Sequence, residues 1–281
     1  MKSVTMSFGA ALLLCASFAS AASKPGNVFH LFQYPGNYNT YLQGVSNSNI
    51  GAGYYVDSTN AEHGFIVQKG VFQQIDYPNA VGTTLYGVNS SGTAVGWYAT
   101  ATAVFAFSYS NGTFTQVGPT GCINNYAYGI NDLGEITGEC QTATALEGWI
   151  FDGTNYQIVA VPGSYFSYVT GINMSGLATV IWAYPNGSIQ SSLYNGASFM
   201  TIDLPGQGQT YAWGLNNAGD VVFNWDHEGR DYGAALLSGA YKTFSAPNCQ
   251  NTIAYGINDH HVIVGSCFEN HAGEFGFYAT Y

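Results

Sequence analysis

Two stretches of the chain, "YGINDLGEITGEC" (128–140) and "YGINDHHVIVGSC" (255–267), are nearly the same sequence. When the glycine of the "YGIN" motif is taken as a reference, related stretches follow it throughout the chain. The six reference glycines are Gly44, Gly87, Gly129, Gly171, Gly214 and Gly256, at intervals of 43, 42, 42, 43 and 42 residues. A spacing this regular indicates a repeat protein.

A second motif lies between successive copies of the first. It consists of an apolar stretch, a turn with glycine, another apolar stretch and then proline, as in "GFIVQKGVFQQIDYP" (64–78). Proline cannot continue the hydrogen-bonding of a central strand, so this motif predicts a hairpin with a defined end. The "YGIN" motif predicts another hairpin, because Asn and Gly tolerate the left-handed angles of tight turns. Each repeat therefore supplies four strands, which predicts an all-β, six-bladed β-propeller with blades of about 42 residues.

The two ends of the chain predict that the ring closes. The stretch "GEFGFYATY" (273–281) matches only the first strand of the second motif, and "NVFHLFQYP" (27–35) matches the missing second strand. We therefore expect the N-terminal strand to complete the last blade. A transmembrane barrel is the alternative fold, but its strands need about 9–11 residues, and most apolar stretches here are nearer about six.

The first residues are predicted to lie outside the fold. Lys2, the apolar run 8–18 and the small residues around Ala21 have the pattern of a secretory signal peptide over residues 1–21. The remaining residues, 22–281, are predicted to form a single propeller domain. We expect a secreted or periplasmic protein.

The composition limits the classes of partner. The chain has 7% charged and 16% aromatic residues, which argues against disorder, and its formal net charge is −11. Nucleic acid and anionic membrane surfaces are poor partners for so negative a protein. No segment beyond the signal region has the length of a transmembrane helix, and we expect a monomer.

Two pairs of cysteines occupy the same places in two repeats. They are Cys122, Cys140, Cys249 and Cys267, and the members of each pair are 18 positions apart. Four cysteines allow three pairings, and the identical placement favours Cys122–Cys140 and Cys249–Cys267. Zinc binding is the alternative, which export of the chain would disfavour. At the position of the second cysteine the other repeats carry an aromatic residue, which we expect to pack under the incoming loop: Tyr55, Tyr98, Trp182 and Trp225.

The repeats resemble those of the HAF-repeat family of extracellular bacterial proteins, which are named for a His-Ala-Phe motif. The similarity lies in His63-Gly64-Phe65, in looser versions at 106–107 and 276–277, and in the "GIN-x-x-G-x-x-x-G" pattern. It covers nearly the whole chain after the signal region. The resemblance implies export and repeated β-structure, and it implies no catalytic residues.

Aromatic residues directly precede four of the reference glycines. They form a candidate aromatic platform: Tyr86, Tyr128, Trp213 and Tyr255. A second set lies two residues earlier, on the same face of each strand: Tyr41, Tyr126, Tyr168 and Tyr211. These side chains would either pack between neighbouring blades or offer ring faces on which sugars stack at the mouth of the channel.

Three loops between the second and third strands hold seven of the sixteen acidic residues. They lie at 56–63, 226–233 and 268–274, in repeats that become neighbours when the ring closes. We call their charged residues the acidic arc: Asp57, Glu62, His63, Asp226, His227, Glu228, Arg230, Asp231, Glu269, His271 and Glu274. A soluble rim is one interpretation. A ligand or ion site is another, in which oxygen ligands suit Ca²⁺ and the histidines would admit zinc.

Together these features favour a secreted binding or interaction module. The expected partner is extracellular polysaccharide, other cell-envelope material or a cell-surface protein. The alternative is a carbohydrate-active propeller hydrolase or lyase that uses carboxylates of the acidic arc. A purely structural protein is a third interpretation. No catalytic residue is assigned, and no cofactor other than Ca²⁺ is suggested.

Overall fold

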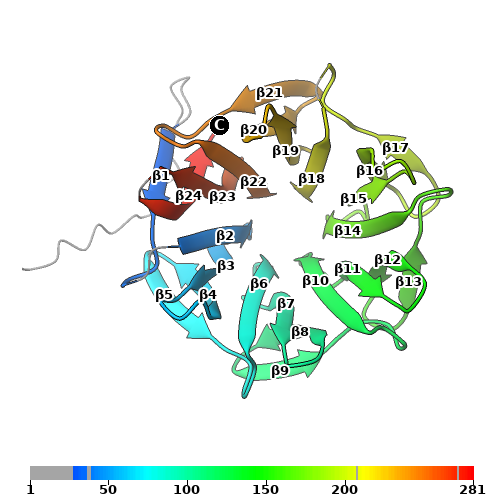
Figure 1. Cartoon of the computed structure of the whole chain (residues 1–281), viewed down its shortest axis with the longest axis horizontal. Coiled ribbons are helices and arrows are strands. Elements are labelled where there is room, and N and C mark those ends of the chain that lie inside the picture. The colour runs from blue at the N-terminus through cyan, green and yellow to red at the C-terminus, as the bar shows by residue number, and fades with distance from the viewer. Residues whose placement is uncertain (1–27, 37–38, 207, 271) are drawn as a thin grey trace, which may run out of the picture.

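The computed structural model describes residues 28–36, 39–206, 208–270 and 272–281. These residues form six four-stranded antiparallel sheets arranged around a central axis (Figure 1). The six-bladed β-propeller predicted from the repeat is therefore confirmed. The predicted signal peptide lies outside the described residues. None of the described residues forms a helix long and apolar enough to cross a membrane.

The blades follow one another in chain order. Blade 1 contains β2 (Asn39–Val45), β3 (Ile50–Val56), β4 (Glu62–Gln68) and β5 (Val71–Ile75). Blade 2 contains β6 (Gly82–Val88), β7 (Ala94–Ala99), β8 (Val104–Ser110) and β9 (Thr113–Gln116). Blade 3 contains β10 (Asn124–Ile130), β11 (Ile136–Gln141), β12 (Leu146–Phe151) and β13 (Tyr156–Val159). Blade 4 contains β14 (Phe166–Ile172), β15 (Ala178–Ala183), β16 (Ile189–Tyr194) and β17 (Phe199–Thr201). Blade 5 contains β18 (Thr210–Leu215), β19 (Val221–His227), β20 (Arg230–Leu237) and β21 (Ala240–Phe244).

Blade 6 is built from both ends of the chain. It contains β22 (Asn251–Ile257), β23 (Val262–Glu269), β24 (Gly273–Thr280) and, as its outer strand, β1 (Val28–Phe32). Strand β1 pairs antiparallel with β24 from Val28↔Thr280 to Phe32↔Gly276. The predicted closure by the N-terminal strand is confirmed, and Figure 1 shows β1 beside β24.

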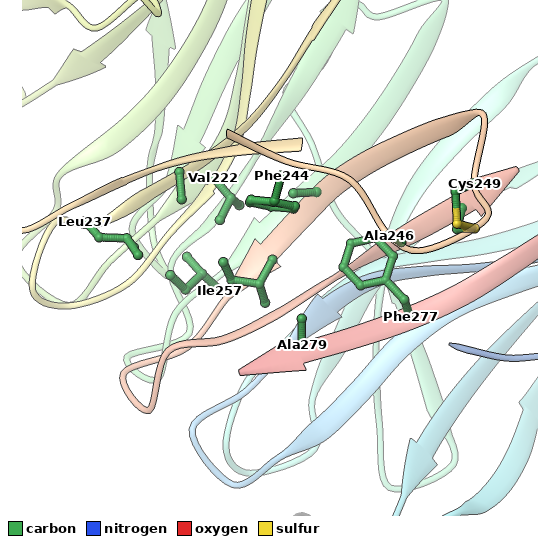
Figure 2. Close-up of a cluster of buried hydrophobic side chains, with 12 residues drawn as sticks. Val222, Leu237, Phe244, Ala246, Cys249, Ile257, Phe277 and Ala279 are labelled. Carbon is green, nitrogen blue, oxygen red and sulfur yellow. A yellow bond between two sulfur atoms is a disulfide. The ribbon is translucent and has the colours of Figure 1, made fainter. Parts of the chain in front are cut away.

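The core lies between blades rather than within them. Each of the six clusters of buried apolar side chains in the described structure joins two neighbouring blades. In the cluster of Figure 2, Val222 and Phe244 of blade 5 contact Ile257 and Phe277 of blade 6. Burying a side chain of this size stabilises the fold by about 1.5–3 kcal/mol. Because every blade needs both neighbours to bury its faces, an incomplete ring would expose a core surface.

The reference glycines are required by close contact between inner strands. The first strand of every blade has a bulge immediately before its reference glycine, as between Ala212 and Gly214. A Cβ atom added at Gly214 would lie 2.7 Å from the backbone oxygen of Tyr255 in the next blade. Glycine therefore allows the inner strands to converge, and each bulge turns the extra residue before the glycine toward the axis.

In five of the six blades, the asparagine of the "GIN" motif links the blade to the next one. Its side-chain amide donates to the backbone oxygen at the same position of the following blade, at 3.0–3.3 Å. The five donors are Asn89, Asn131, Asn173, Asn216 and Asn258, and the last of them bonds Ser46 of blade 1. The side-chain oxygen meanwhile accepts N–H groups of its own hairpin, such as Ser175 and Leu177 for Asn173.

The cysteines pair as predicted. Cys122–Cys140 and Cys249–Cys267 form disulfides, with Cα–Cα distances of 5.3 and 5.5 Å. In blades 1 and 2 the equivalent position holds an aromatic ring that stacks on a tyrosine of the incoming loop. Tyr55 lies 4.0 Å from Tyr34, and Tyr98 lies 3.6 Å from Tyr77, measured between ring centroids. The incoming loop is therefore held by a disulfide in blades 3 and 6 and by an aromatic stack in blades 1 and 2.

We expect the two hydrogen-bonding roles of the asparagine to be separable at Asn173. Asn173→Ser keeps a short acceptor for the hairpin, as Ser46 does for Ile50 in blade 1, but loses the amide donor to Asn216. Leaving that buried carbonyl unpaired should cost about 1–3 kcal/mol, and Asn173→Ala should cost about 1 kcal/mol more. Urea unfolding of the three proteins measures both values. A serine variant as stable as the wild type would show that the link between blades contributes nothing.

Candidate functional site

The predicted aromatic platform lies on the axis of the ring. Tyr86, Tyr128, Trp213 and Tyr255 are the bulged residues of their strands and line one cavity with Gln43 and Thr170. Tyr86 meets Tyr128 edge to face at 5.1 Å, and Trp213 meets Tyr255 in the same way at 5.6 Å. The structure thus brings the four residues together. This axial cavity holds only ≈ 80 Å³, well below the range of about 300–1,000 Å³ that is usual for ligand pockets.

A larger cavity of ≈ 580 Å³ opens between blades 5 and 6. We call it the blade 5–6 cavity. Its lining residues are Gly208, Gln209, Tyr211, Trp213, Asn224, Asp226, Asp231, Ile253 and Tyr255. Two of them belong to the aromatic platform and two to the acidic arc. The structure therefore joins in one cavity two features that the sequence analysis treated separately.

Hydrogen bonds hold the polar side chains of this cavity in place. The indole Nε1 of Trp213 donates to Asn224 Oδ1 at 2.6 Å, and Asn224 Nδ2 donates to Asp231 Oδ1 at 2.7 Å. The hydroxyl of Tyr211 donates to Gln209 Oε1 at 2.8 Å. Because an indole can only donate, the bond from Trp213 fixes the orientation of the Asn224 amide and directs its NH₂ group to the carboxylate.

The two carboxylates face each other across adjacent strands. Asp226 of β19 and Asp231 of β20 are directly paired in the register of the hairpin. Burial raises the pKa of Asp231, and the charge of Asp226 raises it further, whereas the hydrogen bond from Asn224 opposes the rise. Burial also raises the pKa of Tyr211, with both carboxylates adding to the effect. The cavity thus holds two acidic side chains, of which Asp231 is partly buried and Asp226 is exposed.

Asp231 occupies a position that changes from apolar to acidic around the ring. This position is the first or second residue of the third strand in each blade. Its occupants in blades 1 to 6 are Glu62, Val104, Leu146, Ile189, Asp231 and Glu274. The three acids belong to the adjacent blades 5, 6 and 1, which agrees with the arc predicted from the loops. Burial raises the pKa of Glu62 and Glu274 as well, and the charge of Asp231 contributes to the rise at Glu274.

The acidic arc also contains residues that shape their own loops. Asp57 accepts hydrogen bonds from the hydroxyl and N–H of Thr59 and from the N–H of Ala61, and the hydroxyl bond is the main reason that its pKa falls to about 2. His63 lies between two carboxylates, with Nδ1 2.9 Å from Asp76 and Nε2 3.5 Å from Asp57. These contacts are local to blade 1.

The other members of the arc do not line the blade 5–6 cavity. Glu228 lies at the tip of the β19–β20 turn with a φ of 54°, and His227 packs 5.5 Å from the ring of Trp225. Arg230 turns away, since its Nε donates to the backbone oxygen of Gln250 at 3.0 Å. Glu269 ends β23, and His271 lies outside the described residues.

Among the described residues, one group of three side chains brings potential metal ligands within 4.8 Å of one another. It consists of Cys249, Cys267 and Glu269, but the two sulfur atoms are joined in a disulfide and offer no thiolate. In the described part of the chain, the carboxylates of the acidic arc form no such group with one another. The Ca²⁺ suggested from their composition stays a prediction.

A buried carboxyl that the sequence analysis missed lies in blade 3. Glu139 of β11 is only 8% exposed, and the hydroxyl of Tyr128 donates a hydrogen bond to it. Burial raises the pKa of Glu139 to about 7, and the bond from Tyr128 opposes the rise. Glu139 thus holds Tyr128, a residue of the axial cavity.

Two of the residues that sequence reasoning missed share one repeat position. Glu139 and Asn224 both lie ten residues after their reference glycine, where the other blades carry Tyr54, Trp97, Ile181 and Ser266. That chemical variety within an otherwise regular repeat was the available signal. Gln209 and Ile253 carried no comparable signal, because nothing local indicates that they contact the cavity.

Glu139 predicts a pH-dependent stability. A carboxyl whose pKa is about 4.5 in the unfolded chain and about 7 in the folded protein retains its proton longer when folded, so stability falls as pH rises between these values. The loss approaches about 3 kcal/mol above pH ~7. Glu139→Gln should remove this dependence and be the more stable protein at pH ~8. Urea unfolding at pH ~5 and ~8 tests this; equal pH slopes for the two proteins would refute it.

Comparison with known proteins shows the fold and no family. No family model matches the chain, and no curated protein matches it. Among solved structures, the chain is similar in fold to the lectin of Aleuria aurantia in complex with Fucα1-6GlcNAc. The two are 10% identical, with a TM-score of 0.54 over 86% of this chain and 92% of that chain. Virginiamycin B lyase from Staphylococcus aureus is 11% identical, with a TM-score of 0.55 over 91% of this chain and 100% of that chain. AofleA from Arthrobotrys oligospora is 11% identical, with a TM-score of 0.57 over 89% and 85% of the two chains.

Proposed function

We propose that this protein is an exported carbohydrate-binding propeller, and that the blade 5–6 cavity is its sugar site. The observation that supports this most is the combination of three aromatic rings with two amides and two carboxylates in one cavity of ≈ 580 Å³. A sugar ring presents C–H groups on its faces and hydroxyls at its edge. Aromatic faces can pack against the C–H groups, and fixed amides and carboxylates can form hydrogen bonds with the hydroxyls.

Two further features agree with this proposal. Disulfides are typical of exported proteins, as are the signal-like residues 1–21 and the resemblance to the HAF-repeat family. A similar propeller, the Aleuria aurantia protein, is described as a fucose-specific lectin. That likeness is one of fold, and no site residue is carried over from it. The natural source of the sugar would be extracellular polysaccharide or cell-envelope material.

An enzyme acting on carbohydrate is the second candidate function. The observation that favours it is the pairing of Asp226 with Asp231, because one carboxyl of raised pKa beside a second carboxylate is the arrangement that acid–base cleavage of a glycosidic bond requires. A glycan that is bound and then cleaved by the wild type, but only bound by Asp226→Asn, would identify the protein as an enzyme.

The sugar site can be tested with two tyrosines at equivalent positions. Tyr211 of blade 5 lines the cavity, whereas Tyr168 of blade 4 does not. After a glycan array identifies a ligand, titration calorimetry should show that Tyr211→Ala weakens binding at least ~10-fold, about 1.4 kcal/mol, because a stacking surface is lost. Tyr168→Ala should bind normally. Equal losses in both variants, or an array without any bound glycan, would count against the proposal.

A further inference from the structure

The blade 5–6 cavity combines negative charge with aromatic walls and has no positive lining residue. Its ionisable carboxyls are Asp226 and Asp231, and the cations in the described part of the chain are Lys69, Arg230 and Lys242, none of which lines it. Arg230 is the nearest in sequence. Its guanidinium is engaged elsewhere, with Nε on the backbone oxygen of Gln250 and its carbon 5.5 Å from the ring centre of Tyr232.

A neutral ligand would leave this charge uncompensated. The pair of facing carboxylates has one neutral hydrogen-bond donor, the amide of Asn224, which bonds one oxygen of Asp231. Any ligand that fills the cavity removes water from both groups, and a buried charge is costly unless it is paired. In the free protein, burial and the charge of Asp226 already raise the pKa of Asp231.

The surroundings reinforce the preference for a cation. Glu274 lies close enough to Asp231 for the charge of one to raise the pKa of the other, and Glu62 continues the series in blade 1. The chain as a whole carries a formal charge of −11. A cleft with one sign of charge and low-dielectric walls concentrates ligands of the opposite sign. The rings of Tyr211, Trp213 and Tyr255 add attraction, because an aromatic face favours a cation.

We infer that the blade 5–6 cavity selects sugars that carry a protonated amine, with the ammonium group placed between Asp226 and Asp231 and the sugar ring on the aromatic wall. This inference rests on the proposed function, since it names the class of sugar that the same site takes. Amino sugars with a free amine, as in de-N-acetylated chitin, have this chemistry. Sugars with carboxylates would be repelled by the same two aspartates.

A matched pair of oligosaccharides tests the inference. The probes are a β-1,4-linked glucosamine tetramer and its fully N-acetylated counterpart, titrated by calorimetry at about pH 6, where a sugar amine is protonated. We expect the free amine to bind at least ~10-fold more tightly, a preference of about 1.4 kcal/mol. Asp226→Asn and Asp231→Asn should each reduce this ratio toward one, while the affinity for the N-acetylated tetramer persists.

Glu147→Gln is the matched control, because it removes one negative charge from β12 of blade 3, away from the cavity. It should leave the ratio unchanged. A ratio that falls equally in Glu147→Gln would trace the preference to net charge and overturn the inference. Equal binding of the two tetramers by the wild type would also overturn it, while leaving carbohydrate binding intact. If neither tetramer binds and no glycan on the array does, the proposed function itself fails.

Discussion

The hydrogen bond from one asparagine amide to the next blade is the interaction on which the ring depends. In each of five blades the amide oxygen organises the hairpin at the end of the first strand, while the amide nitrogen bonds the backbone of the following hairpin. A second layer continues this contact, as where Asn217 and Asn47 both donate to Asp259. Local turn and long-range assembly therefore share one side chain in these five blades.

This linkage determines what the channel contains. Because the hairpins hold the inner strands close together, only glycine fits at the reference position, as the contact of Gly214 with Tyr255 shows. The bulge before that glycine then turns one residue of each blade toward the axis. The repeat thus places six equivalent residues around the axis, and the side chains at these positions differ between blades.

Function in this scaffold arises where the repeats differ. The start of the third strand is aliphatic in blades 2, 3 and 4 and acidic in blades 5, 6 and 1, although the backbone position is the same. The raised pKa values of Glu62, Asp231 and Glu274 show what these substitutions cost in desolvation. Under the proposed function, a ligand of opposite charge would offset part of that cost.

The sequence by itself determined the architecture, because the repeat interval, the turn residues and the split last blade are all local or periodic features. It also determined the disulfide pairing, since Cys140 and Cys267 occupy one repeat position, and it indicated the blades in which the charge is concentrated. Only the tertiary structure decided which of those charges share a cavity. Asp226 and Asp231 line it with Trp213 and Tyr255, whereas Glu228 and Arg230 of the same loop do not. The reason is physical. Periodicity specifies the strand and face of a residue, but which side chains of neighbouring blades meet in one cavity depends on contacts between residues far apart in the chain, such as Trp213 and Tyr255.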